Sequence, residues 1–222
     1  MSEQQQPFIY RPPQQALEIL FEDDDLVIIN KPVGLLSVPG RLPEHYDSCY
    51  TRILKLYPTA KVTHRLDMAT SGILMFAKHR DAEVAVSKMF QKKNIEKHYL
   101  ALVEGQLSGV GDVEAPIMTD WPNRPKQKID FIEGKAAKTL YYSMGFDGQH
   151  QISRIRLIPI TGRSHQLRLH MAYIGHPITG DKLYHPEPQR SMLNRMALHA
   201  SYLALQHPLR HNRLEIISAP EF

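Results

Sequence analysis

Short apolar runs separated by polar turns dominate this chain and predict mainly strands. Residues 17–22 and 26–30 are two apolar runs separated by three aspartates, which predicts a hairpin with an acidic turn. Apolar positions at helical spacing predict three helices. The first is capped by Asp47 or Ser48 and ended by Pro58, the second covers 82–93, and Ser164 is the expected cap of the third. Further strands are expected at 62–66, 73–77, 97–103, 139–147, 151–159 and 213–218.

An acid lies between two of the expected strands. Residues 64–72 have the sequence His-Arg-Leu-Asp-Met-Ala-Thr-Ser-Gly, and Asp67 follows the run 62–66 where the backbone leaves the sheet. A carboxylate between Arg65 and a hydroxyl-bearing turn suits a nucleophile or a base. An Asp in such a connection more often caps its own backbone, and the residues alone leave both interpretations open.

A basic segment, residues 119–138, contains the only tryptophan of the chain. Its two prolines exclude a helix or a central strand and predict a stiff exposed loop. Its side chains offer a stacking surface, base-edge hydrogen bonds and phosphate contacts. A solvated charged loop is the alternative. The candidate RNA-contacting residues are Trp121, Asn123, Arg124, Lys126 and Lys128.

Two other segments carry candidate polar residues. In the strand 97–103, alternation places Tyr99 on the face opposite Leu100 and Leu102, where a core aromatic with a hydrogen-bonded hydroxyl is the alternative to a functional tyrosine. A turn at 161–163 precedes the third helix, whose first turns carry three polar side chains. Those are His165, Gln166 and Arg168.

The histidines do not predict a metal site. His165, His170 and His176 are separated by five and six residues, which is not the spacing of a helical zinc pair, and no acid or cysteine lies at ligand spacing. Cys49 is the only cysteine, which excludes an internal disulfide and fits a reducing compartment.

Composition permits a nucleic-acid partner without requiring one. The net charge is +4 and the isoelectric point is near 9.1. The N-terminal residues lack a secretory pattern, and no apolar run approaches the roughly 18 residues of a membrane span, so we expect a soluble, cytoplasmic protein. Without heptads or a long exposed apolar run, a monomer is expected.

The segment around Asp67 resembles the catalytic motif of the RluA family of RNA pseudouridine synthases. Three more segments resemble motifs of that family: Asn-Lys-Pro-x-Gly-Leu at 30–35, Lys-x-Tyr-x-Ala at 97–101, and Thr-Gly-Arg-x-His-Gln-Leu-Arg-x-His at 161–170. The resemblance covers 17–222. It implies an α+β pseudouridine-synthase fold, with a mixed, mostly antiparallel central sheet flanked by helices and loops and an active site in a cleft across it. We expect a mobile tail at 1–15 and a single catalytic domain at 16–222, without the N-terminal accessory RNA-binding domain of larger members.

The resemblance also implies residue roles. Asp67 would be the catalytic carboxylate, Arg168 its partner, and Tyr99 the ring that stacks on the uracil and could accept the C5 proton. Arg65 would enter the stack that a flipped uridine leaves. Beyond the basic segment, the residues assigned to substrate binding are Asn30, Lys31, His64, Arg65, Arg163, His165 and Gln166.

Isomerisation of uridine involves no redox change and no energy input, so no cofactor or metal is expected. The resemblance implies two RNA substrates, a 23S rRNA hairpin loop and the anticodon stem-loop of tRNA. A synthase restricted to one of them is an alternative. A non-catalytic RNA-binding module is another, disfavoured by the joint presence of Asp67, Tyr99 and Arg168. A metal-dependent hydrolase that uses the histidines is a third.

Overall fold

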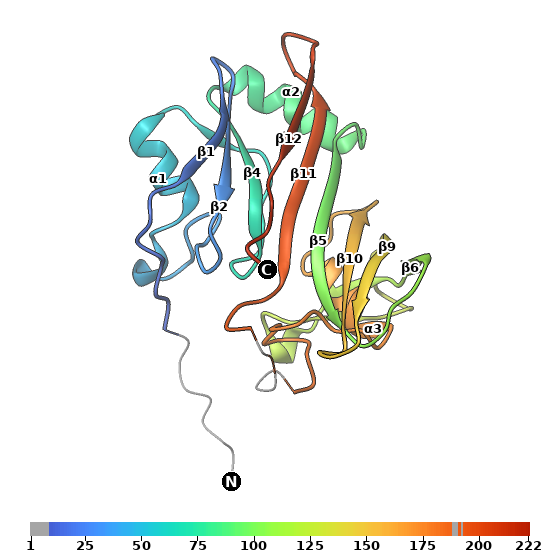
Figure 1. Cartoon of the computed structure of the whole chain (residues 1–222). Coiled ribbons are helices and arrows are strands. Elements are labelled where there is room, and N and C mark those ends of the chain that lie inside the picture. The colour runs from blue at the N-terminus through green and yellow to red at the C-terminus, as the bar shows by residue number, and fades with distance from the viewer. Residues whose placement is uncertain (1–8, 188–190, 192) are drawn as a thin grey trace.

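A single large sheet forms the body of the protein (Figure 1). The structure is a computed structural model that describes residues 9–187, 191 and 193–222. Among these residues the ten-stranded sheet has the order β1-β2-β4-β11-β5-β10-β9-β6, with β12 paired to β11 and β3 to β4, and β7 and β8 form a separate two-stranded ribbon. The strands are β1 (Glu18–Glu22), β2 (Leu26–Lys31), β3 (Lys61–Val62), β4 (Ser71–Ala77), β5 (Glu96–Glu104), β6 (Val110–Glu114), β7 (Ile117–Thr119), β8 (Gln127–Ile129), β9 (Lys138–Asp147), β10 (Ile152–Pro159), β11 (Leu198–Gln206) and β12 (Arg213–Ile217). The helices are η1 (Pro43–His45), α1 (Cys49–Leu56), α2 (Arg80–Gln91), η2 (Trp121–Asn123) and α3 (Gln166–Tyr173).

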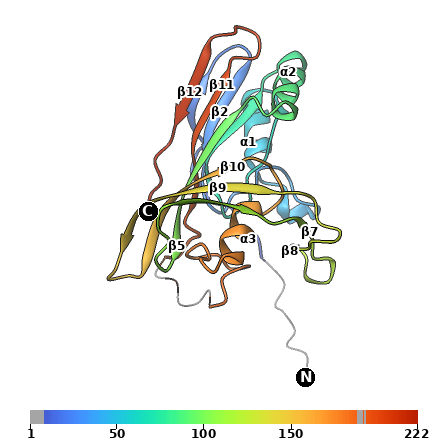
Figure 2. The same ribbon diagram turned by 90° about the vertical axis from the view of Figure 1, so that its right-hand side faces the viewer.

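The sheet is mixed and mostly antiparallel, as expected. Strand β11 runs parallel to β4 and antiparallel to β5, so it joins an N-terminal half of the sheet to a later half. Helices α1 and α2 lie on one side of the half formed by β2, β4 and β11, while α3 lies by β9 and β10 (Figure 2). The predicted α+β fold is confirmed.

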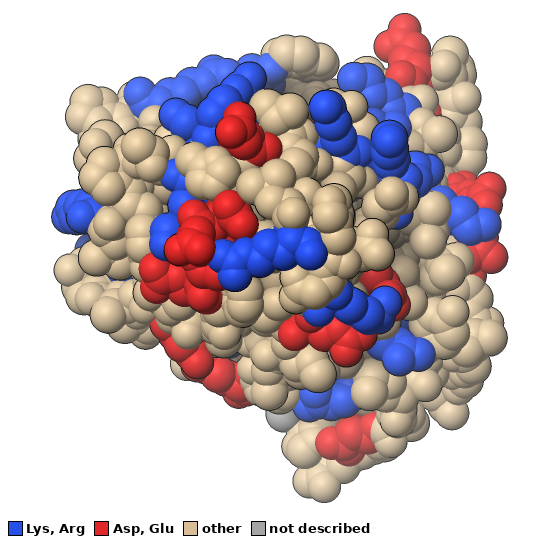
Figure 3. All heavy atoms as spheres, turned by 90° about the horizontal axis from the view of Figure 1, so that it is seen from above, with Lys and Arg blue, Asp and Glu red and all other residues tan. Residues whose placement is uncertain are grey.

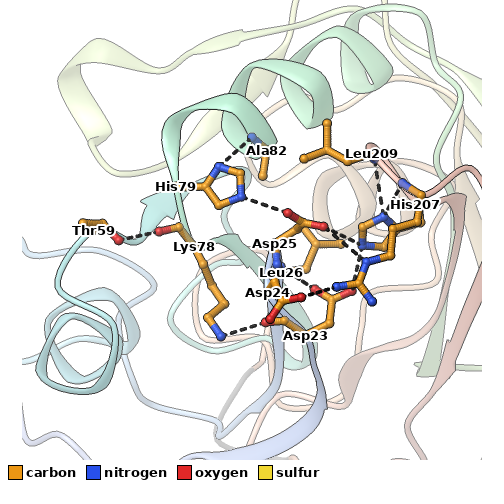
Figure 4. Close-up of polar contacts among 11 residues, drawn as sticks. Asp23, Asp24, Asp25, Leu26, Thr59, Lys78, His79, Ala82, His207 and Leu209 are labelled. Carbon is orange, nitrogen blue, oxygen red and sulfur yellow. Dashed lines mark hydrogen bonds and ion pairs between the residues drawn. The ribbon is translucent and has the colours of Figure 1, made fainter.

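The predicted hairpin forms because the acidic turn bonds its own backbone. Asp23 Oδ1 accepts hydrogen bonds from the N–H groups of Asp25 and Leu26, at 2.9 and 2.8 Å. His207, from the turn between β11 and β12, lies with its Nε2 2.9 Å from Asp23 Oδ2, and His79 Nε2 is 2.9 Å from Asp25 Oδ1 (Figure 4). These contacts tie one end of the sheet to the start of α2.

Helix α1 confirms one of the two cap alternatives. The Ser48 side chain accepts from the Thr51 N–H, and the Thr51 hydroxyl accepts from the Ser48 N–H, which is a capping box. The described chain before β1, which falls partly within the expected tail at 1–15, contacts the domain. Tyr10 is buried and its hydroxyl donates to the Asp47 carbonyl at 2.9 Å, while Arg52 donates to the Pro13 carbonyl at 2.6 Å. Residues 10–15 are therefore packed on the domain, and 1–8 lie outside the described residues.

The expected strand at 62–66 is wrong beyond Val62. Thr63 Oγ1 donates to the Met75 carbonyl at 2.6 Å, and His64 Nε2 accepts from the Met75 N–H at 3.1 Å. The two side chains thereby occupy the backbone groups that a longer strand would use. The expected cap at Ser164 is also wrong, since α3 begins at Gln166, after His165 in the left-handed region with φ 54°.

The basic segment 119–138 is more ordered than a plain loop. Its prolines exclude a long strand, but β7 and β8 pair in antiparallel fashion on either side of the short helix η2. The ribbon forms because three residues on each side suffice for the pairing, Ile117 to Ile129 and Thr119 to Gln127 among them. We call residues 117–129 the β7–β8 ribbon.

The end of the molecule that bears α2 and the β1–β2 turn is mixed in charge, with acidic side chains lying among basic ones (Figure 3). The excess positive charge is therefore not gathered into one uninterrupted patch on that face. Among the described residues, no helix is long and apolar enough to span a membrane.

Gly72 permits the close contact between β4 and β11. Its φ is +106°, and a Cβ there would lie 2.3 Å from the Ala200 carbonyl oxygen. Gly72→Ala should therefore lower the free energy of unfolding by more than Gly175→Ala, which has φ +84° but nothing within 4 Å of an added Cβ. The control should cost about 1–2 kcal/mol through backbone strain, and overpacking should add about 1–3 kcal/mol at Gly72. Urea denaturation measures both variants, and equal losses would contradict the steric explanation.

Candidate active site

Asp67 lies in the loop between β3 and β4, and the backbone around it is held on both sides. Ser37 Oγ accepts from the Leu66 N–H at 3.0 Å and donates to the Leu66 carbonyl at 2.7 Å. The Thr70 N–H donates to the Asp67 carbonyl at 3.1 Å, closing a turn. The Asp67 side chain keeps 28% of its surface exposed. A partly exposed carboxylate is thus held on a fixed backbone.

Lys31 supports this loop from inside. Its side chain is fully buried, and its ammonium donates to the carbonyls of Leu35, Pro32 and Met68 at 2.7, 2.9 and 3.1 Å. Burial lowers the pKa of Lys31 to about 8. All three ammonium N–H groups are used by the protein, so this geometry leaves none for the RNA contact that the sequence suggested. Asn30, beside it, donates to Glu18 Oε2 at 2.9 Å.

Arg168, on the first turn of α3, joins two carboxylates. Its Nε and Nη2 donate to the two oxygens of Asp181, each at 2.7 Å, and its Nη1 donates to Asp67 Oδ2 at 3.2 Å. The side chains of Arg168 and Asp181 are 5% and 0% exposed. Burial alone would raise the pKa of Asp181, but Arg168 and the N–H groups of Leu183 and Tyr184 outweigh it and lower that pKa. The expected contact between Arg168 and Asp67 is present.

Tyr99 lies on the buried face of β5 with Ala101 and Val103, while Leu100 and Leu102 are only partly buried. The predicted alternation is confirmed. Burial raises the pKa of Tyr99 well above its usual value, and the charge of Asp67 raises it further. The phenol is therefore neutral near pH 7, which suits a packing or stacking ring better than a phenolate base.

Two residues beside Asp67 differ in exposure. His64 bonds the β4 backbone and packs its ring 5.3 Å from that of Phe90. Burial lowers the pKa of His64 to about 3, so the ring is neutral. Arg65, two residues before Asp67 in the chain, is exposed. Arg65 is therefore the more exposed of the two and the better placed to meet a substrate.

Gln166 stabilises the turn that leads into α3. Its Oε1 accepts from Thr161 Oγ1 at 2.7 Å and from the Arg163 N–H at 3.0 Å. Its Nε2 donates to the Lys138 carbonyl at 2.9 Å and to Thr139 Oγ1 at 3.0 Å. All of its polar capacity is thus used inside the protein. Arg163 is exposed and donates from Nε to the Ala136 carbonyl at 3.1 Å.

His165 lies close to Asp67, with its Nε2 3.8 Å from Asp67 Oδ2. Its Nδ1 is 2.7 Å from the hydroxyl of Tyr184. Burial lowers the pKa of His165, with Arg168 adding to the effect and Asp67 opposing it. The imidazole is therefore neutral near pH 7.

The β7–β8 ribbon presents an exposed aromatic. Trp121 is 63% exposed, and the guanidinium carbon of Arg124 lies 3.4 Å from the centre of its ring. Asn123 donates to Asp120 Oδ2 at 2.9 Å, and Lys128 is paired with Asp130 at 3.0 Å. Trp121 and Arg124 together form a flat, positively charged surface that a base can stack on. Lys126 belongs to the same turn.

Asp181 and Tyr184 are site residues that the sequence did not single out. They follow Gly180, whose φ is +77°, in a turn after the helix. No helical or strand period connects Asp181 to Arg168, thirteen residues earlier. Only the fold brings these groups together.

A group of possible metal ligands and a cavity lie among the described residues, and neither includes Asp67. Among the described residues, the group close enough to hold a metal ion is Asp23, Asp25 and His207. It lies beyond the far end of β4, and Arg210 Nε, 3.5 Å from Asp25 Oδ2, already supplies positive charge there. A cavity of about 200 Å³ is lined by Lys31, Ser71, Arg195 and His199 among others, and Asp67 is not part of its wall.

A family model described as RNA pseudouridylate synthase matches residues 25–173, which span the loop of Asp67 and the turn of Arg168. The chain belongs to the RluA family of RNA pseudouridine synthases. It is 46% identical over 215 residues to the dual-specificity RNA pseudouridine synthase RluA of Escherichia coli strain K12, with 96% of this chain and 98% of that protein covered. The RluA protein of Vibrio parahaemolyticus is 47% identical over 207 residues, with 91% and 83% covered.

Solved structures agree with this assignment. Human RNA pseudouridylate synthase domain containing 1 superposes with a TM-score of 0.78 at 27% identity, covering 96% of this chain and 87% of that one. Human RNA pseudouridylate synthase domain containing 4 gives 0.73 at 25% identity, with 92% and 89% covered. This RluA-family protein is therefore an isomerase that acts on RNA, with the predicted pseudouridine-synthase fold.

Asp181→Asn should destabilise the protein strongly, because it leaves the buried Arg168 guanidinium without its main partner. Loss of one member of a buried pair typically costs about 3–5 kcal/mol. Urea denaturation at pH 7 measures the change. Glu215→Gln, which breaks an ion pair with Arg213 whose side chain is 65% exposed, is the control and should change stability little.

The free energy of unfolding of Asp181→Asn should also depend less on pH in the acid range than that of wild type. The folded pKa of Asp181 lies below its unfolded value, so its contribution is fully present above about pH 4 and is lost as pH falls through the folded pKa. Wild type should then lose more stability than Asp181→Asn as the pH falls below about 4. Parallel curves for the two proteins would contradict the pairing.

Proposed function

We propose that this enzyme converts uridine to pseudouridine in two RNAs, a 23S rRNA hairpin loop and the anticodon stem-loop of tRNA, with Asp67 as the catalytic carboxylate. The dual-specificity name of the relatives at 46–47% identity supports the breadth. The placement of Asp67 supports the role. Its Oδ2 is held by Arg168, and no hydrogen bond to its Oδ1 is found among the described residues. One carboxylate oxygen is thus fixed and the other is free for a substrate.

The reaction breaks the N1–C1′ bond of uridine and forms a C5–C1′ bond, with loss of the C5 proton. A carboxylate beside the ribose can attack C1′, stabilise positive charge there or take the C2′ proton. Hydrolytic glycosidases use two carboxylates because water must be activated. Asp181 cannot serve as a second one, because both of its oxygens are bound by Arg168 and its side chain is fully buried. The site therefore suits an isomerisation with one carboxylate.

Other residues would bind and orient the RNA. Tyr99 would stack on the uracil as a neutral phenol, and the exposed Arg65 would fill the stack that the flipped uridine leaves. Trp121 and Arg124 would contact loop bases, with Lys126 and Lys128 near the phosphates, so binding should weaken with salt. A synthase restricted to one RNA remains the alternative. The catalytic domain would begin near residue 16, with Tyr10 and its neighbours packed against it.

The first test is tritium release from RNA labelled at C5 of uridine. Asp67→Asn should abolish release on both RNAs, because an amide cannot supply the carboxylate charge or attack C1′. The melting temperature should stay near that of wild type, since Arg168 keeps Asp181. Asp24→Asn, whose side chain is 93% exposed, is the matched control and should release tritium normally. A substantial residual rate in Asp67→Asn would contradict the proposed role.

Assays with a chelator present, on the rRNA hairpin and the tRNA stem-loop separately, address the alternatives. Release by wild type from one RNA alone would favour the restricted synthase. Tight binding without release from either would favour a non-catalytic binding module. Cleavage of the RNA without tritium release, suppressed by the chelator, would favour a metal-dependent hydrolase.

Trp121→Ala should weaken RNA binding more than chemistry. Loss of one stacked base typically costs about 1–3 kcal/mol, and filter binding with single-turnover kinetics separates affinity from the chemical rate. Trp121→Phe keeps an aromatic face and should recover part of the affinity. Unchanged affinity of Trp121→Ala for both RNAs would remove the ribbon from substrate recognition.

A further inference from the structure

A chain of polar contacts leads from the β7–β8 ribbon to the Asp67 carboxylate. The Gln127 N–H, at the start of β8, donates to the Tyr184 hydroxyl at 2.8 Å. That hydroxyl is 2.7 Å from His165 Nδ1. His165 Nε2 then lies 3.8 Å from Asp67 Oδ2. The segment that carries Trp121 and the carboxylate are thus connected through two side chains.

The hydrogen-bond directions along this chain follow from the neutral Tyr184 hydroxyl and from the charge of Asp67. Burial raises the pKa of Tyr184 to about 12, so its hydroxyl keeps its proton. The Asp67 carboxylate favours the tautomer of the neutral imidazole that carries its hydrogen on Nε2, the nitrogen that faces it. His165 Nδ1 is then an acceptor for the Tyr184 proton, while the hydroxyl oxygen accepts from the Gln127 N–H. At 3.8 Å the contact between Nε2 and Asp67 is electrostatic rather than a hydrogen bond.

His165 and Arg168 approach the same oxygen of Asp67. Arg168 Nη1 donates to Oδ2 at 3.2 Å, and His165 Nε2 faces Oδ2 as well. Both contacts fall on one edge of the carboxylate, and no hydrogen bond to Oδ1 is found among the described residues. The backbone conformation of His165 is unusual for a non-glycine residue, with φ 54°, and its ring packs edge-on to Tyr184 with centroids 5.6 Å apart. The surroundings thus maintain a strained residue whose ring faces the carboxylate.

We propose that His165 and Tyr184 are positioning residues that orient the Asp67 carboxylate and connect it to the RNA-contacting ribbon. The proposal rests on the proposed function, and it assigns His165 a role toward Asp67 instead of toward RNA. A ribbon displaced from its place would withdraw the Gln127 N–H from the Tyr184 hydroxyl, leave that hydroxyl free to turn away from His165 and so loosen the carboxylate. Engagement of the ribbon by RNA would hold the chain of contacts in place.

Tyr184→Phe tests the hydroxyl alone, because the ring keeps its place beside the Arg168 guanidinium, 5.2 Å away. In single-turnover and steady-state tritium release, its kcat should fall at least about tenfold, since a small misplacement of a catalytic group has large effects. The KM for RNA should change less than about twofold, because no RNA contact is lost. Tyr173→Phe, at a tyrosine that is 51% exposed, is the control and should match wild type.

Two substitutions of His165 separate positioning from folding. His165→Gln places an amide N–H near the site of Nε2 and can still face Asp67. His165→Asn is too short to reach Asp67 but is better tolerated at positive φ. We expect Gln to retain the higher kcat and Asn the higher melting temperature. If His165 had only a structural role, His165→Asn would have both the higher kcat and the higher melting temperature.

The double variant Tyr184→Phe/His165→Asn should be no slower than His165→Asn alone, because both changes break the same connection. Additive losses, an unchanged kcat in Tyr184→Phe, or a higher kcat for Asn than for Gln would each overturn the inference. These outcomes leave the proposed function intact if wild type releases tritium and Asp67→Asn does not. Absence of release by wild type would overturn both.

Discussion

The site depends on the pairing of the buried Arg168 guanidinium with two carboxylates. The guanidinium binds Asp181 through two parallel hydrogen bonds and Asp67 through a third, although these carboxylates lie 13 and 101 residues away in the chain. A buried charge is tolerated only when it is paired, so the helix α3, the turn at 180–184 and the Asp67 loop must come together as one unit. One guanidinium faces two carboxylates, and Asp67 is the more exposed of the two. The negative charge that is not neutralised is therefore presented at the surface.

A second constraint is the backbone of the Asp67 loop, which is not part of a strand and needs partners. Side chains from other segments supply them. Ser37 bonds Leu66, and Lys31 bonds Met68, so both flanks of Asp67 are fixed. Residues that resemble family motifs thus divide into two kinds. Lys31 and Gln166 hold backbone inside the protein, while Asp67 and Arg65 reach solvent.

The β7–β8 ribbon is connected to the Asp67 loop through its base, while its tip stands apart. Trp121 is exposed at its tip, with the Arg124 guanidinium stacked on its ring. The Gln127 N–H at its base reaches Tyr184. A ribbon of this kind can vary in sequence at its tip without altering the contacts of Asp67.

Much of this protein follows from local sequence. Apolar periodicity predicted the hairpin at β1–β2, helices α1 and α2, and the strands β4, β5, β9 and β10, because burial of one face imposes a period on any helix or strand. The string around Asp67 identified the family, and with it the expected contact with Arg168. The tertiary structure decided the rest. Strand β3 ends early because the side chains of Thr63 and His64 bond the backbone C=O and N–H of Met75. Asp181 and Tyr184 join the site through a turn. No local period encodes which distant groups will neutralise a buried charge, since that pairing is set by the packing of the whole sheet and its helices.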